Sequence, residues 1–230
     1  MEAVGIPIPI EDGGSRSRSL QVRRELGVDE GNFVVTTIGN LVPSKSHELF
    51  LSAAARVVAQ REDVRFFVIG EGSLRAVLEE QIAREGLHDH IRLLGQRTDV
   101  DRILAATDIY VRPGIVEGLA GITVFEAQAF HVPVITFDTE DVRVAVSHME
   151  TGLLVPRGDV AALSEAIVCL VNDPRLARSL ASAARRHVEQ RFSIQAVADG
   201  LESLYGTLLP AGGRWQRESG LSGAAGKAPG

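Results

Sequence analysis

The sequence predicts an α/β protein with a doubly wound, Rossmann-like parallel sheet of about six strands. Helices are expected on both faces of the sheet, with extra helices at the C-terminal end. Short apolar runs rich in β-branched residues alternate with longer segments of helical periodicity, as in strands joined by crossover helices. Three of these runs end directly at a glycine: Gly39, Gly70 and Gly95. Such turns are typical of the carboxyl ends of parallel strands, where these folds bind ligands.

The first half of the chain supplies three strands and the helices between them. The expected order is strand 33–38, helix 44–60, strand 65–69, helix 73–86, strand 91–94 and helix 100–106. Serine side chains commonly accept a hydrogen bond from the first turn of a helix. We therefore expect Ser44 or Ser46 to cap the first helix and Ser73 to cap the second, with Gly86 ending it.

The second half continues the alternation and then departs from it. The expected order is strand 108–111, a turn and helix within 117–129, strand 132–136, strand 152–155 and helices at 159–171, 173–190 and 194–208. Asp159 and Asp173 are the expected caps of the first two of these last helices. The final two helices have no strand between them, so they are expected to form an appendage packed on the sheet or on a neighbour.

Three regions follow from these patterns. Residues 1–31 are interpreted as a connector from a missing N-terminal domain, residues 32–209 as the Rossmann-like domain, and residues 210–230 as a disordered tail rich in glycine and alanine. The connector carries a small basic cluster of Arg16, Arg18, Arg23 and Arg24. We interpret this cluster as a solvated face, and leave open a contact with a membrane surface or a partner.

The composition argues against several classes of protein. A net charge of −6 gives no reason to expect nucleic acid as a partner. The N-terminus lacks the pattern of a signal peptide, and no apolar run approaches the roughly 18 residues of a membrane span. Cys169 is the only cysteine, and the histidines lack metal-ligand spacing. The expectation is a cytoplasmic protein without a metal site.

One stretch, 117–129, combines features that suit phosphate and sugar. It opens with a glycine-rich turn, which lets a ligand approach the backbone closely. The helix start beyond the turn offers unpaired N–H groups and a positive dipole end to phosphate. Glu117 and Glu126 bracket the stretch and can accept hydrogen bonds from sugar hydroxyls.

Six segments, taken in order, resemble one family. They are GNLVPSK (39–45), VIGEGSLRAVLEEQ (68–81), IRLLG (91–95), ATDIYVRP (106–113), EGLAGITVFEAQAFHVPVI (117–135) and TGLLVPRGDVAALSEAI (151–167). Over about residues 5–208 the chain resembles the C-terminal, nucleotide-sugar-binding domain of a family 4 glycosyltransferase. That group consists of retaining enzymes with the two-Rossmann-domain B-type fold.

The resemblance implies roles for named residues. Lys45 is expected to contact the donor diphosphate and to stabilise the charge that builds on the leaving phosphate. Glu126 is expected to bind the ribose hydroxyls, and Glu117 to lie near the donor sugar or its phosphate. Backbone groups are expected to hold the diphosphate from Leu119, Ala120, Gly121, Ile122 and Thr123. No metal or other cofactor is implied, because the lysine and helix N–H groups supply the positive charge.

Five further positions are expected in the donor site. The turn Gly95-Gln96-Arg97 would touch the base, so Gln96 and Arg97 are candidate nucleotide contacts. Gly70 and Gly72 would line the cleft. Asn40 occupies the position of an arginine that commonly contacts the diphosphate in this family.

The chain also departs from the family pattern. Eight residues separate Glu117 from Glu126, where seven are usual. His131 stands where glycine is usual, and Val144 where a glutamate is usual. A glycine pair after the fifth strand is replaced by Glu140-Asp141, and two acids there would repel a diphosphate unless they point away.

The resulting hypothesis is a glycosyltransferase domain that binds a nucleoside-diphosphate sugar and transfers the sugar with retention. The family's N-terminal Rossmann domain, which binds the acceptor, is expected to be supplied in cis or in trans. The alternative is a non-catalytic nucleotide-sugar-binding or partner subunit of a split enzyme. A dinucleotide site is disfavoured, because Gly70-x-Gly72 lacks the third glycine of that fingerprint. The base, sugar and acceptor stay open.

Overall fold

The structure is a computed structural model and describes residues 16–115 and 121–208. Six strands form one parallel sheet in the order β3-β2-β1-β4-β5-β6. Their bounds are β1 (Phe33–Ile38), β2 (Val64–Ile69), β3 (Ile91–Gly95), β4 (Ile109–Arg112), β5 (Val134–Phe137) and β6 (Leu153–Val155). Because the strand order reverses between β1 and β4, that junction is the switch point at which such sheets bind ligands. The predicted fold class is confirmed.

Each central strand is buried on both faces, which explains its continuous apolar run. In β1, Val35 packs against one helical layer, whereas Val34 packs against the other. In β4 the same alternation sends Val111 to the first layer and Tyr110 to the second. Successive side chains of a strand point to opposite faces, so both layers of helices are required to cover the sheet.

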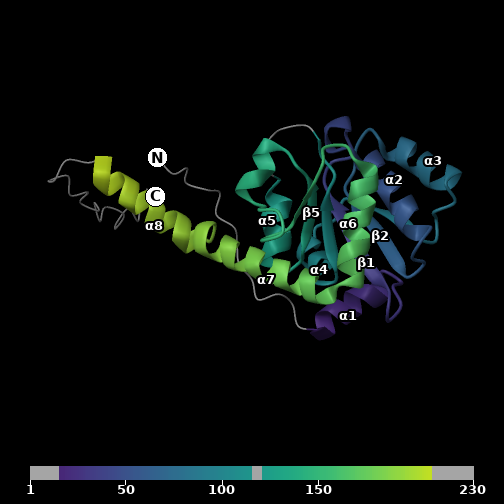
Figure 1. Cartoon of the computed structure of the whole chain (residues 1–230), viewed down its shortest axis with the longest axis horizontal. Coiled ribbons are helices and arrows are strands. Elements are labelled where there is room, and N and C mark those ends of the chain that lie inside the picture. The colour runs from purple at the N-terminus through teal and green to yellow at the C-terminus, as the bar shows by residue number, and fades with distance from the viewer. Residues whose placement is uncertain (1–15, 116–120, 209–230) are drawn as a thin grey trace, which may run out of the picture.

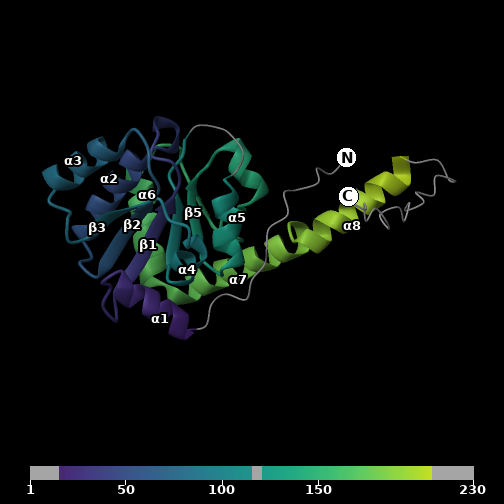
Figure 2. The same ribbon diagram turned by 180° about the vertical axis from the view of Figure 1, so that it is seen from behind.

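Helices cover the two faces in distinct groups (Figures 1 and 2). The first face is covered by α2 (His47–Val58), α3 (Arg75–Arg84) and α6 (Val160–Asn172). The second is covered by α1 (Arg16–Glu25), α4 (Val100–Ala105), α5 (Ile122–Ala129) and α7 (Pro174–Arg191). Beyond α7, α8 (Ile194–Leu208) projects away from the body as an arm.

The helix α1 belongs to the packed body. Val22 of α1 and Leu26, the residue after the helix, are buried, and they pack with Ile103 of α4 and Phe67 of β2. Arg23 pairs with Asp108 at 2.6 Å, and this tie fixes α1 to the start of β4. The sequence analysis placed the start of the domain at residue 32. The packed unit therefore begins earlier in the chain, because it includes α1. The predicted tail, 210–230, lies outside the described residues.

Two of the predicted caps are confirmed and the serine caps are wrong. The Asp159 carboxylate accepts a hydrogen bond from the Ala162 N–H, and that of Asp173 accepts from Arg175 and Leu176. The α3 helix starts after Leu74, and no side chain caps it. Ser46 precedes α2 in the left-handed conformation (φ 51°), which points its hydroxyl away from the first helical N–H groups.

Two short 3-10 helices were not predicted. The first, η1 (Pro43–Lys45), precedes α2 and is separated from it by the left-handed Ser46, so the predicted helix 44–60 is two elements. The second, η2 (Glu140–Val144), follows β5. Both occur at the carboxyl edge of the sheet, where they shape the loops around the candidate site.

Candidate functional site at the carboxyl edge of the sheet

The glycine turns after β1, β2 and β3 pack directly on one another. Gly39 donates its N–H to the carbonyl of Ile69, and Gly70 donates to the carbonyl of Gly95, both at 2.9 Å. A Cβ atom on Gly70 would lie 2.0 Å from the carbonyl oxygen of Gly39. Only glycine permits this approach, so the turns form a continuous backbone floor at the edge.

A second contact braces the β1 and β2 loops. Leu41 donates its N–H to the Glu71 carbonyl, and the Leu41 carbonyl accepts from Leu74, both at 2.9 Å. A Cβ atom on Gly72 would lie 2.4 Å from the Leu41 carbonyl oxygen. The predicted residues Gly70 and Gly72 therefore lie where the two loops touch, and they hold the segment that leads to Lys45.

Lys45 ends η1 directly above this floor. It is half-buried, and its Cγ atom lies 3.8 Å from the position that a Cβ atom on Gly39 would take. Asn40 is exposed, and its backbone carbonyl faces the ring of His47, with 3.2 Å between Nε2 and the oxygen. Gly114, after β4, approaches the Ser44 carbonyl, so the β1 and β4 loops meet here.

His47, the first residue of α2, is a site residue that the sequence analysis missed. Its side chain is buried, and its Nδ1 atom has no hydrogen-bond partner. Burial lowers the pKa of His47 from 6.5 to about 4, and the nearby Lys45 ammonium acts in the same direction. The signal was its place two residues after Lys45 at the start of an apolar helix face.

This lowered pKa predicts a loss of stability in acid. Between pH 6.5 and 4 the unfolded chain takes up the His47 proton and the folded chain does not, so the free energy of unfolding falls as the pH falls through this window. The expected loss is on the order of 3 kcal/mol. Urea unfolding at pH 7 and pH 4 tests this. His47→Gln should flatten the profile, and exposed His88→Gln should leave it unchanged; an unchanged slope in His47→Gln would contradict the assignment.

The start of α5 is fixed by a buried tyrosine. Tyr110 of β4 donates its hydroxyl proton to the Thr123 Oγ1 atom at 2.7 Å, and burial raises the Tyr110 pKa to about 12. Gly121 occupies the N-cap position and no side chain caps the helix. Uncapped N–H groups at Ile122 and Thr123 are suited to an anion.

Glu126 lies one turn into α5 and is partly buried. Desolvation is the cause that raises its pKa, and no partner among the described residues offsets that cost. A ligand that donates hydrogen bonds would stabilise the charged form of a partly buried carboxylate of this kind. Glu117, Leu119 and Ala120 lie outside the described residues.

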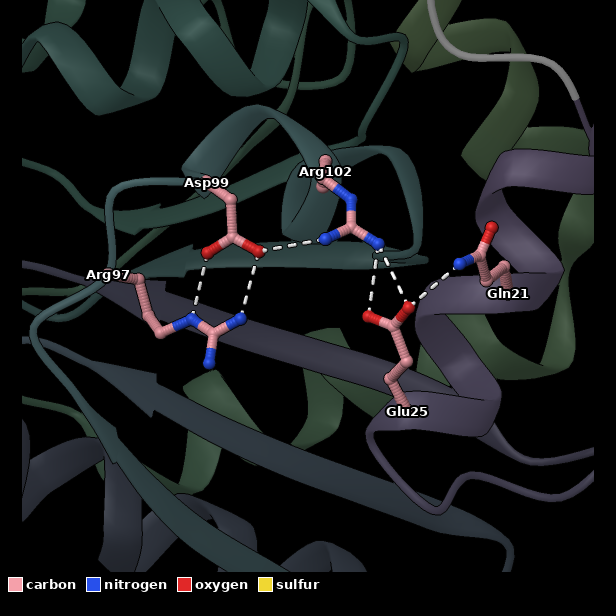
Figure 3. A network of polar contacts seen from close by, with 5 residues as sticks. All are labelled: Gln21, Glu25, Arg97, Asp99 and Arg102. Atoms are coloured by element: carbon pink, nitrogen blue, oxygen red, sulfur yellow. Dashed lines mark hydrogen bonds and ion pairs between the residues drawn. The ribbon is translucent and has the colours of Figure 1, made fainter.

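Arg97 is engaged by its own loop. Its Nε and Nη2 atoms each donate to Asp99 at 2.8 Å, and the network continues through Arg102 and Glu25 to Gln21 (Figure 3). Asp99 thereby holds the Arg97 side chain toward α4, while the adjacent Gln96 is exposed. Of the two predicted base contacts, the Arg97 side chain is held by Asp99, whereas the Gln96 side chain has no hydrogen-bond partner among the described residues.

The acids after β5 do not both face the edge as free charges. Asp141 pairs with Arg112, at the end of β4, with 2.8 Å between Oδ2 and Nη2, and both side chains are largely buried. This pair neutralises one of the two charges that were expected to repel a diphosphate. Glu140 is exposed. Sequence spacing gave no signal for the Arg112–Asp141 pair, because 29 positions separate its members.

Four of the seven buried side-chain polar atoms that lack a partner among the described residues lie at this edge. His47 Nδ1 and Glu48 Oε2 lie at the start of α2, and Thr139 Oγ1 and Asp141 Oδ1 lie after β5. Such atoms are rare in folded proteins and often mark functional sites. A cavity of about 410 Å³ lies instead at the opposite edge, lined by the strand starts at Phe33, Ile109 and Pro133. The candidate site is therefore marked by the polar groups at the carboxyl edge, and not by that cavity.

Two kinds of feature are absent from the described residues. Within 16–115 and 121–208, no three His, Cys, Asp or Glu side chains are grouped so as to hold a metal ion. In the same part of the chain, no helix combines the length and apolar character needed to traverse a membrane.

The fold and the site define a Rossmann-type α/β domain whose ligand edge is the carboxyl side of its sheet. The chain belongs to the family of glycosyl transferases group 1, whose model matches residues 19–187. It is therefore a group 1 glycosyltransferase domain.

Known proteins agree with this assignment. A GDP-mannose-dependent monoacylated alpha-(1-6)-phosphatidylinositol monomannoside mannosyltransferase of Corynebacterium glutamicum is 32% identical over 191 residues, which are 79% of this chain and 49% of that protein. The crystal structure of Anabaena Alr3699/HepE in complex with UDP matches with a TM-score of 0.79 at 25% identity, over 84% of this chain and 54% of that one.

A third match shows the fold alone. The C-terminal domain of a glycosyl transferase group 1 family protein (LpcC) from Francisella tularensis has a TM-score of 0.71 at 22% identity, and the match covers 84% of this chain and 97% of that domain. The chain spans about half the length of the curated relatives it matches.

Proposed function

We propose that this chain is the donor-binding half of a retaining, family 4 glycosyltransferase that uses a nucleoside-diphosphate sugar. The observation that carries the proposal is Glu126, a partly buried carboxylate without a described partner, one turn beyond the uncapped start of α5. The helix start suits a diphosphate, and the carboxylate suits the vicinal hydroxyls of a ribose. One ligand, a nucleoside diphosphate, carries both groups.

Lys45 completes the phosphate side of the proposed site. As the glycosidic bond breaks, negative charge builds on the leaving diphosphate, and a fixed ammonium lowers the barrier to that step. With the uncapped N–H groups of α5 at the same edge of the sheet, the proposed site would need no metal ion for charge neutralisation. Asn40, where an arginine is common, leaves Lys45 as the main cation of the β1 loop.

The remaining roles follow from the same ligand pose. Gly121, Ile122 and Thr123, with Leu119 and Ala120 before them, would hold the diphosphate through their backbone. Glu117 would lie near the sugar. Gln96 would contact the base, and Arg97 would do so only through the nitrogen that Asp99 leaves unoccupied.

A second Rossmann domain, in the same chain or in a separate one, would bind the acceptor and close the cleft. The proposal is supported by the length of the relatives, of which this chain spans about half, and by its match to a C-terminal domain over 97% of that domain. Peripheral membrane association and a cytoplasmic location stay predictions.

If Glu126 binds the ribose hydroxyls, replacing it should abolish the preference of the protein for ribose over 2′-deoxyribose nucleotides. Wild-type protein should bind uridine or guanosine diphosphate at least about 10-fold more tightly than the 2′-deoxy form of the same nucleotide. The reason is that a hydrogen bond to a charged group contributes about 1.5–3 kcal/mol. Glu126→Ala should bring the two affinities to within about 3-fold. Isothermal titration calorimetry with each pair measures this.

Exposed Glu165 on α6 provides the control, since Glu165→Ala makes the same chemical change away from the edge. That variant should keep the wild-type preference. A Glu126→Ala protein that still prefers the ribose form would remove the role proposed for Glu126.

A further inference from the structure

His47 is placed to control the turn that presents Lys45. Its Nε2 atom lies 3.2 Å from the Asn40 carbonyl oxygen, which can only accept a hydrogen bond, so Nε2 carries the proton. The ring also lies 3.8 Å from the position of a Cβ atom on Gly39, next to the Lys45 stem. One side chain thus ties the first residues of the turn to the start of α2, two residues after Lys45.

This arrangement is unfavourable in one respect. With the proton on Nε2, the buried Nδ1 atom is a bare acceptor, and it has no partner. Burying an unsatisfied polar atom destabilises the folded protein, whereas an apolar side chain of similar volume would avoid that cost. Polar groups kept at the expense of stability are expected at functional sites.

His47 cannot act on a ligand directly. Its residue exposure is 1%, and the ring lies against the backbone of Gly39 and Asn40. Any effect on ligand binding must therefore pass through the turn. Within that turn, η1 places Lys45 one residue before the left-handed Ser46, and a change in the turn would move the ammonium.

We propose that His47 is a positioning residue that fixes the Gly39–Lys45 turn and so holds the Lys45 ammonium against the phosphate of the donor. This inference rests on the proposed function, because it assumes that Lys45 meets a diphosphate. Gly39 lies beside both groups, since a Cβ atom at that position would make ordinary van der Waals contact with the imidazole and with the lysine stem.

The test compares four variants: His47→Leu, His47→Gln, Lys45→Ala and the double variant His47→Leu/Lys45→Ala. Calorimetry measures their affinities for the diphosphate and monophosphate of the nucleoside that wild-type protein binds. His47→Leu should bind the diphosphate about 10-fold more weakly and the monophosphate within about 2-fold of wild type. His47→Gln, whose amide can donate to Asn40, should recover most of the loss.

The double variant separates positioning from a general structural effect. If His47 acts through Lys45, the double variant binds the diphosphate no more weakly than Lys45→Ala, because coupled residues are not additive. Multiplicative losses, or an equal loss of monophosphate affinity in His47→Leu and His47→Gln, would overturn the inference. Unchanged diphosphate affinity in His47→Leu would overturn it while leaving the proposed function intact. No diphosphate binding by wild-type protein would overturn both.

Discussion

Replacing Lys45 with alanine is expected to weaken binding of a nucleoside diphosphate by about 10- to 100-fold. A hydrogen bond to a charged group contributes about 1.5–3 kcal/mol, and each 1.4 kcal/mol is a factor of ten in affinity. In an enzyme completed by its second domain, the expected loss in the rate of transfer is larger, about 100- to 1,000-fold, because the charge on the leaving phosphate is greatest in the transition state. Calorimetry and a transfer assay measure the two losses.

The chain offers a matched control for this substitution. Lys227 is the only other lysine, so Lys227→Ala makes the same change in charge. It should leave the affinity within about 2-fold of wild type. Equal losses in the two variants would show that net charge, and not the place of Lys45 on the β1 loop, governs binding.

Replacing Gly70 with alanine is expected to destabilise the protein by about 3 kcal/mol or more. The new Cβ atom would stand 2.0 Å from the Gly39 carbonyl oxygen, so the backbone of the β1 or β2 loop must move. The left-handed φ of 145° at Gly70 adds to the strain. Chemical denaturation monitored by circular dichroism measures the change.

Gly86 isolates the effect of overlap from that of backbone conformation. It also has a left-handed φ, 67°, yet nothing lies within 4 Å of a Cβ atom placed there. Gly86→Ala should therefore cost only about 1–2 kcal/mol. If Gly70→Ala is no less stable than Gly86→Ala, the close packing of the β1 and β2 turns is wrong.

Most of the fold could be predicted from the sequence because its signals are local. Apolar β-branched runs specify strands buried on both faces, and the terminal glycines of β1, β2 and β3 mark the turns that the structure packs together. Aspartate caps were predicted correctly for the same reason. The serine caps failed, since the left-handed conformation at Ser46 depends on how the β1 loop packs and not on the serine itself.

The candidate site was predicted less completely, because its electrostatics depend on neighbours that only the sheet brings together. Arg112 and Asp141 meet since β4 and β5 pair in parallel, so their carboxyl ends adjoin. The prediction that Arg97 contacts the base did not anticipate its ion pair with Asp99, two residues away, which holds the guanidinium. The burial of His47 likewise follows from the stacked turns, and the only sequence signal for it is its place at the start of an apolar helix face, two residues after Lys45.

The central claim is that the carboxyl edge of this sheet binds a nucleoside diphosphate through Lys45 and the start of α5. Titration calorimetry of the wild-type protein with uridine and guanosine diphosphates, each to millimolar concentration, tests it most directly. The account predicts saturable binding of at least one of the two, with the affinity falling about 10- to 100-fold in Lys45→Ala. Absence of heat and of any thermal shift with both ligands would contradict the account.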